Sequence, residues 1–195
     1  MALSLVTPPA IEPITLAEAK RQCRAPADVS EDGLFVGLIA AARERAEGIT
    51  GRQLIEATWD EKLDDIDCDE IWLPRAPLIS VTSVTYIDSA GATQTWASTE
   101  YQVDAPTGPF ARRGRVLPLP TASWPLAQSG RVNAFAVRFK AGYGTAAASV
   151  PMAIRQAMLL MIGAWFVNRE DMVTGGLVTV PLGALALLTP YKVYV

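Results

Sequence analysis

The chain has 195 residues, of which 50% are hydrophobic and 19% are charged. This composition supports a folded core and excludes wholesale disorder. The formal net charge of −3 gives no global basic excess of the kind that grips nucleic acid along a whole surface. Because the sequence contains no histidine, Ser–His–Asp and Cys–His catalysis, HExxH zinc sites and histidine pH switches are excluded.

The N-terminal part of the chain reads as helical. Residues Thr15 to Glu18 form a capping-box pattern, which predicts a short helix that ends near Arg24. A second helix is expected to start at 28–30 and to end at Gly51, because apolar residues recur at helical spacing between Leu34 and Ile49. Segment 1–13 contains no Lys or Arg and three prolines, so it is not expected to be a signal peptide.

The middle of the chain changes to strand patterns. Short segments rich in Val, Ile, Thr, Trp and Tyr alternate with turn signals, which predicts a small antiparallel β region. The expected strands are Ile55–Leu63, Glu70–Leu73, Ser80–Ile87, Thr93–Ala97, Tyr101–Val103, Gly114–Leu117 and Val132–Ala141. In the last of these, Phe135, Val137 and Phe139 alternate with polar or small residues, which indicates one buried and one solvated face.

A second long helix is expected to begin at Pro151 and to run through Phe166, apolar around nearly its whole circumference. Its longest apolar stretch, 157–167, is well short of the roughly 20 residues that cross a bilayer, so no membrane association is expected. Cys23 and Cys68 are far apart and lack a CxxC partner, so we expect free thiols in a soluble intracellular protein without metal or cofactor.

The predicted class is α+β: a helical core of two main helices and short terminal helices, with an inserted antiparallel β region. The expected segments are 1–52 (N-terminal helical segment), 53–148 (β region), 149–171 (core helix) and 172–195 (apolar tail). The tail carries one charged residue, Lys192, and includes a brief helix at Pro181–Leu188. An exposed apolar tail is unfavourable for a soluble monomer, so it either folds back on its own helices or docks on another protein.

Charge is segregated along the β region. Residues 54–104 hold eleven acidic and two basic side chains, whereas residues 105–150 hold six basic and no acidic ones. Either the two blocks neutralise each other across strands of one chain, or they meet opposite charges on neighbouring copies. The candidate inter-subunit charges are Asp64, Asp65, Asp67, Asp69, Glu70, Arg112, Arg113 and Arg115.

Several motifs occur together in a fixed order. They are Ile14–Lys20, Leu38–Arg52, Leu73–Val84, Phe139–Gly144, Val150-Pro151, Ile154–Leu160, Trp165, Asn168–Glu170 and Pro190-Tyr191. In this order they resemble the head–tail connector (adaptor, or head-completion) proteins of long-tailed bacteriophages, prophages and gene transfer agents. The resemblance covers nearly the whole chain, although each motif alone indicates only a helix or a turn.

The resemblance implies a structural virion protein of the neck, assembled in the bacterial cytoplasm, and not an enzyme. It implies a ring of twelve copies beneath the portal protein, which extends the DNA channel and joins the head to the next neck, stopper or tail protein. DNA would pass through the lumen without tight binding. The implied portal-binding residues lie in the tail: Leu177, Val178, Val180, Leu182, Leu185, Leu187, Leu188, Pro190, Tyr191, Val193 and Tyr194.

Besides a generic oligomeric scaffold unrelated to phage, two other functions stay open from the residues alone. One is a DNA-binding module that uses the basic block from Arg112 to Lys140. The other is a carboxylate-based hydrolase, for which the acidic run from Asp64 to Glu70 is the best candidate site. The same run is also typical of a hydrated loop between strands.

Overall fold

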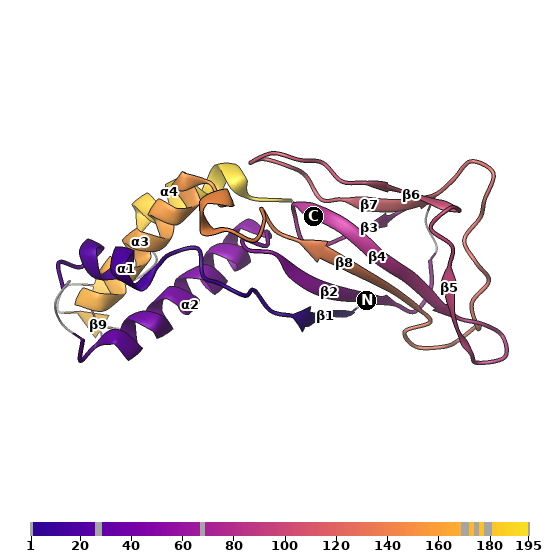
Figure 1. Cartoon of the computed structure of the whole chain (residues 1–195), viewed down its shortest axis with the longest axis horizontal. Helices are drawn as coiled ribbons and strands as arrows, with labels where there is room; N and C mark the ends of the chain where they lie inside the picture. Colours follow the sequence, from indigo (N-terminus) through magenta and orange to yellow (C-terminus); the bar gives the residue numbers. More distant parts are fainter. Residues whose placement is uncertain are drawn as a thin grey trace. The chain divides into compact units, whose positions relative to one another are not determined.

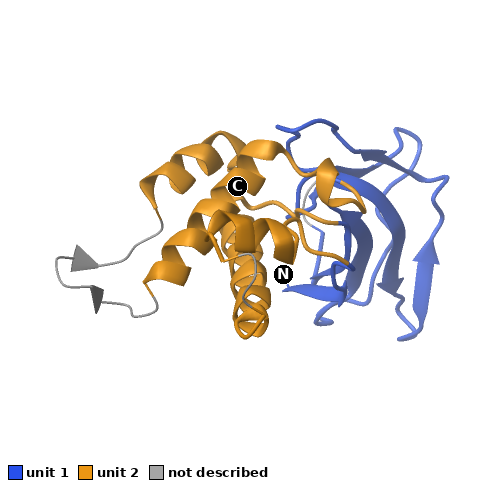
Figure 2. Cartoon of the chain, turned by 60° about the vertical axis from the view of Figure 1, so that its left-hand side comes forward, with its two compact units in different colours: residues 1–10, 56–143 blue, residues 11–55, 144–195 orange. Residues whose placement is uncertain are grey.

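The computed structural model describes residues 2–25, 29–66, 69–168, 172–173, 176–177 and 181–194. The chain divides into two compact units (Figure 2). Unit 1 comprises residues 1–10 and 56–143, and unit 2 comprises residues 11–55 and 144–195. The predicted α+β class is confirmed. However, the helices form a unit of their own and are not a core shared by the whole chain.

Unit 1 is built on a five-stranded antiparallel sheet in the order β1-β2-β8-β4-β5 (Figure 1). Its strands are β1 (Ala2–Thr7), β2 (Ala57–Leu63), β8 (Phe135–Ala141), β4 (Leu78–Ile87) and β5 (Thr93–Trp96). The predicted alternation in β8 is confirmed, because Phe135, Val137 and Phe139 are buried and Arg138 is exposed. One face of this sheet therefore supplies the core.

A second, three-stranded sheet completes unit 1. It runs in the order β3 (Ile71–Trp72), β7 (Arg115–Pro118) and β6 (Tyr101–Asp104). Apolar side chains of both sheets form one buried cluster. Within it the Trp96 ring lies 5.1 Å from the Tyr101 ring and 4.9 Å from the Trp124 ring, centroid to centroid. The tryptophans of this cluster thus act as core anchors.

The sequence patterns did not predict one strand of this unit, β1. Residues 2–7 were assigned to the helical N-terminal segment, but they pair antiparallel with β2, with Leu3 opposite Glu61. The predicted last strand also began too early, at Val132. Asn133 has a φ of 55°, a left-handed conformation that an extended strand does not accommodate, so β8 begins after it.

Unit 2 holds α1 (Leu16–Gln22), α2 (Asp32–Thr50), α3 (Met152–Val167) and α4 (Leu182–Leu188). The shorter elements are η1 (Ala147–Ser149), η2 (Thr189–Tyr191), β9 (Met172–Val173) and β10 (Gly176–Leu177). The capping box is confirmed: Thr15 Oγ1 accepts from the Glu18 amide, and the Glu18 carboxylate accepts from the Thr15 amide. Gly51 ends α2 in a left-handed conformation, as predicted, whereas the helix begins at Asp32 and not at 28–30.

Packing between helices covers much of the apolar circumference of α3. The helix contacts α1, α2 and α4, and Phe166 stacks on Phe35 of α2 with ring centroids 4.8 Å apart. Ile154, Met158 and Met161 are fully buried. The apolar helix is therefore central to unit 2, while its two ends remain open at Met152 and Val167.

Gly114 is a position where unit 1 tolerates no side chain. A Cβ there would lie 2.6 Å from Leu78 Cβ, far inside van der Waals contact. We expect Gly114→Ala to destabilise unit 1 by about 2 kcal/mol, because the buried core must shift to accept it. Gly37→Ala is the control, since its Cβ on α2 meets nothing within 4 Å and should stabilise unit 2 by about 0.5–1 kcal/mol. Urea unfolding followed by hydrogen exchange in each unit measures both; an unchanged unit 1 in Gly114→Ala would contradict the packing.

Candidate interaction surfaces

The predicted basic cluster forms an ion-pair network on the three-stranded sheet. Arg115 of β7 donates from Nε to Asp104 Oδ2 of β6 at 2.9 Å and from Nη1 to Glu70, just before β3. Arg112 Nη2 donates to the same Asp104 oxygen at 2.6 Å. Hydrogen bonds from Arg115 and then Arg112 hold the pKa of Asp104 below its ordinary value. The two opposed charge blocks therefore meet within a single chain.

Trp72 of β3 lies close to all three arginines of the predicted basic cluster. The guanidinium carbons of Arg112, Arg113 and Arg115 lie 5.4, 5.7 and 5.2 Å from the centroid of its ring. Such contacts favour cations over the negative face of the aromatic ring. The Trp72 indole and the Asp104 carboxylate together hold the cluster on unit 1. Arg112 and Arg115 therefore already have partners within their own chain.

The rest of the basic block is also largely neutralised within unit 1. Arg138 of β8 makes two hydrogen bonds to Asp60 of β2, at 2.7 and 2.8 Å, and Lys140 contacts Glu56 at 3.0 Å. Four of the six basic side chains in residues 105–150 are thus ion-paired within the chain. A phosphate backbone would have to compete with these carboxylates, which disfavours the DNA-binding alternative.

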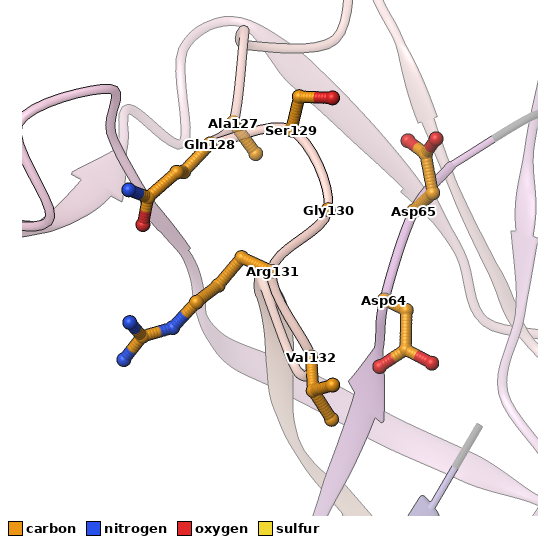
Figure 3. Close-up of a pocket in the computed structure, with 8 residues that line it drawn as sticks. All are labelled: Asp64, Asp65, Ala127, Gln128, Ser129, Gly130, Arg131 and Val132. Carbon is orange, nitrogen blue, oxygen red and sulfur yellow. The ribbon is translucent and has the colours of Figure 1, made fainter.

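The acidic run lies at the end of β2, and part of it lines a pocket of about 380 Å³. Figure 3 shows Asp64 and Asp65 on one side of the pocket and the 127–132 loop on the other. Asp64 accepts a hydrogen bond from the Asn133 amide at 2.7 Å, and Asp65 accepts one from the Ile66 amide at 2.8 Å. These contacts fit a structured, hydrated loop.

The remaining acids of the run do not add a recognisable site. Asp69 is exposed, and Asp67 lies outside the described residues. Among the parts of the chain that the structure describes, no three or more Cys, Asp or Glu side chains gather closely enough to hold a metal ion. In those same parts, no helix is both long and apolar enough to span a membrane.

Glu61 is a buried carboxyl that sequence reasoning did not single out. It lies in β2 on the core face and is 1% exposed, and neither of its carboxyl oxygens has a hydrogen-bond partner. Burial raises its pKa to about 7, against a smaller lowering by the nearby charge of Arg113. The sequence did carry a signal for this burial. Trp59, Glu61 and Leu63 alternate along one strand, so their side chains lie on the same face of the sheet.

The apolar tail folds back in part on unit 2. Leu188 is fully buried and Tyr191 is 9% exposed, while α4 packs against α3. The backbone is fastened as well: Arg52 Nε donates to the Tyr191 carbonyl, and the Val193 amide donates to the Thr50 carbonyl at 2.8 Å. Of the predicted portal-binding residues, Leu188 and Tyr191 are therefore already removed from water within unit 2.

Other residues of the tail remain accessible. Leu182 is 85% exposed and Tyr194 is 74% exposed. Pro190 is also exposed, and Leu185, Leu187 and Val193 are half-buried. The predicted residues Val178 and Val180 lie outside the described residues, as does the side chain of Leu177. The tail thus combines an internal anchor with a set of exposed apolar side chains.

Comparison with solved structures gives matches along the whole chain. A chain in the neck of an empty gene transfer agent particle, computed with C6 symmetry, is 26% identical, with a TM-score of 0.83. A chain of a native gene transfer agent virion is 25% identical, with a TM-score of 0.81. A chain in the neck of a native particle, computed with C12 symmetry, is 25% identical, with a TM-score of 0.76. Each match covers 100% of this chain and 96% of the other.

No protein-family model matches the sequence, and the comparison with curated proteins gives no match. The similarity to known proteins therefore comes from the solved structures, and it extends over both units of the chain. The order of the motifs predicted a similarity that extends along the whole chain, and the three matched structures show one. The chain is a structural relative of gene transfer agent neck proteins, and its resemblance to the head–tail connector family is confirmed.

Proposed function

We propose that this protein is a head–tail connector that assembles as a ring of twelve copies beneath a portal protein and joins the head to the next neck or tail protein. The observation that carries the proposal is the match of the entire chain to a neck protein at a TM-score of 0.83. The C6 and C12 symmetries named for two of the matched necks support a ring. The ring would extend the DNA channel as part of the virion neck.

The charges of unit 1 support passage of DNA without tight binding. The net charge of the chain is −3, and most of the basic block is held by neighbouring carboxylates. A surface with few free cations releases few counterions on contact with DNA, so affinity stays low. Tight DNA binding by the isolated protein, falling steeply with salt, would instead favour the DNA-binding alternative.

The described acids give the hydrolase alternative little support. In the run from Asp64 to Glu70, Asp64 and Asp65 accept hydrogen bonds from backbone amides, and Glu70 accepts one from Arg115. A general acid and base need to face a substrate from opposite sides of a cleft. We therefore infer a structural, non-enzymatic role for the chain.

The exposed part of the tail is the surface that we assign to the portal. Leu182 and Tyr194 are large, apolar or aromatic, and mostly exposed on unit 2, next to a buried anchor that holds the tail in place. Side chains of this kind contribute most of the affinity when they enter a pocket on a partner. Leu188 and Tyr191 support the tail from within and are not assigned a portal contact.

Light scattering with the portal protein of the same particle tests the proposal. The wild-type chain is expected to bind the portal, whether or not it is monomeric alone. The double variant Leu182→Asp, Tyr194→Asp is expected to bind at least about tenfold more weakly, equivalent to about 1.4 kcal/mol. Leu126→Asp is the matched control, because Leu126 is 92% exposed on unit 1 and should leave portal binding unchanged. Failure of the wild-type chain to bind any portal would contradict the proposed function.

A further inference from the structure

The five-stranded sheet of unit 1 ends in two open edges. β1 pairs with β2 on one side, β5 pairs with β4 on the other, and neither has a second partner strand among the described residues (Figure 1). An open edge presents unpaired backbone N–H and C=O groups, which attract another strand. Soluble proteins usually protect such edges with charged side chains, proline or a covering segment.

Neither of the two edge strands contains a charged side chain or a proline. β1 has the sequence Ala-Leu-Ser-Leu-Val-Thr, without a charged residue or proline, and five of its six side chains are exposed. Leu5 is 47% exposed and Val6 is 42% exposed. β5, Thr-Gln-Thr-Trp, is likewise uncharged, and its first three side chains are exposed. For a soluble chain, such a pair of edges is expected to be covered in the assembled state.

The two edges also match in length. The pairing of β1 with β2 is regular from Ala2 to Leu5, and the register shifts between Leu5 and Thr7. The regular part of β1 therefore has four residues, which equals the length of β5. Pro8 and Pro9 follow directly and cannot donate backbone hydrogen bonds, so the edge that can accept a strand ends there.

We propose that β1 of one copy adds to β5 of the next, so that the five-stranded sheet continues from copy to copy around the ring. This inference rests on the proposed function, because it specifies the contact between copies of the ring. A β1–β5 contact is head-to-tail and can close into a ring, whereas a β1–β1 contact would be isologous and would stop at a dimer. It also covers both edges at once, which a β1–β1 dimer does not.

A contact of four residue pairs is small. The net contribution of each backbone hydrogen bond is small, so one such contact does not hold two copies together in dilute solution. Binding to a common platform raises the effective concentration of neighbouring copies and makes the same contact sufficient. The chain alone is therefore expected to be monomeric, with the edges pairing when copies gather on the portal.

Cross-linking locates the contact. In a Cys23→Ser, Cys68→Ser background, the variant Ser4→Cys, Thr95→Cys is incubated with portal and treated with a short bismaleimide. A ladder of dimers, trimers and higher species is expected, while Ser4→Cys alone and Thr95→Cys alone remain monomeric. Dimers from Ser4→Cys alone would indicate a β1–β1 contact and would overturn the inference.

Charged substitutions give a second test that does not depend on cross-linker reach. Ser4→Lys on β1 and Thr95→Lys on β5 are each expected to weaken copy-to-copy assembly at least about tenfold. Thr82→Lys is the matched control, because Thr82 is exposed on β4, an internal strand of the same sheet, and should leave assembly unchanged. Circular dichroism checks that each variant is folded.

The outcomes separate this inference from the proposed function. If copies gather on the portal but the double-cysteine variant gives no ladder and the lysine variants assemble normally, the edge contact is wrong and the connector role stands. If no copies gather on the portal, both are overturned. A ladder together with weak assembly of both edge variants supports both.

Discussion

Glu47→Ala is expected to destabilise unit 2 by about 3 kcal/mol, because Glu47 is a buried carboxylate on which several donors converge. Its Oε1 accepts from the Leu54 amide at 3.0 Å and from Gln53 Nε2 at 2.8 Å, and its Oε2 accepts from Arg43 Nη1 at 3.2 Å. Gln53 and Leu54 are almost fully buried. Alanine would leave their N–H groups without this acceptor in a place that water reaches poorly.

The loss is smaller than that of a fully isolated ion pair. Arg43 also pairs with the Glu12 carboxylate, with Nε 2.9 Å from Oε2, so its guanidinium keeps an ion-pair partner when Glu47 is removed. The larger part of the expected cost therefore comes from the two neutral donors. Glu47→Gln should cost less, because its amide oxygen still accepts from the Leu54 amide.

Urea unfolding at neutral pH, followed by hydrogen exchange in α2 and α3 of unit 2, measures the effect. Glu44→Ala is the matched control: it lies on the same helix, 3.6 Å from Arg43, but its side chain is 71% exposed. Exposed ion pairs contribute little, so a change within about 0.5 kcal/mol is expected. Equal losses for Glu44→Ala and Glu47→Ala would show that the buried hydrogen bonds contribute nothing beyond the charge.

Local patterns predicted most of the elements of this fold. The capping box at Thr15 and the left-handed Gly51 marked two helix ends, and the alternation in β8 assigned the buried face. These signals are local, because caps and periodicity depend on residues a few positions apart. β1 was missed for the opposite reason: its partner β2 lies more than fifty residues away, and its own sequence is short and followed by prolines.

The candidate surfaces were predicted less well, again for physical reasons. The sequence showed that the charge blocks are opposed, but it left open whether they meet within a chain or between chains. That choice depends on the register of β6 and β7, which places Asp104 opposite Arg115. Similarly, an apolar tail has the same composition whether Leu188 enters its own unit or a partner, so composition alone could not separate its internal anchor from its exposed residues.

Glu61 is expected to have the opposite effect to Glu47, since its carboxyl is buried without a hydrogen-bond partner. Above pH 7 the carboxyl is ionised in the folded state, in a site where burial opposes the charge. We expect Glu61→Gln to stabilise unit 1 by as much as about 3 kcal/mol at pH 8, from a pKa near 7 in the folded state against an ordinary value of 4.5. Glu61→Met, which is apolar, should stabilise unit 1 at least as much.

The sign of the pH dependence follows from the raised pKa. Between pH 4.5 and about 7 the folded state retains a proton that the unfolded state has lost, so the contribution of Glu61 to stability falls as the pH rises through this window. At pH 4 the wild type and Glu61→Gln should be nearly equal, and they should diverge up to about pH 7. Taking the difference between the two proteins removes the contributions of the other carboxylates.

Asp60, the neighbouring residue on the opposite face of β2, is the control. Hydrogen bonds from Arg138 lower its pKa, so Asp60→Asn should reduce stability at neutral pH, and this loss should shrink as the pH falls through the acid range. Urea unfolding at several pH values, followed by hydrogen exchange in β2 and β8, separates the two residues. If Glu61→Gln were no more stable than the wild type at pH 8, the Glu61 carboxylate would have to be solvated or paired in the folded protein, and its burial in the core of unit 1 would be refuted.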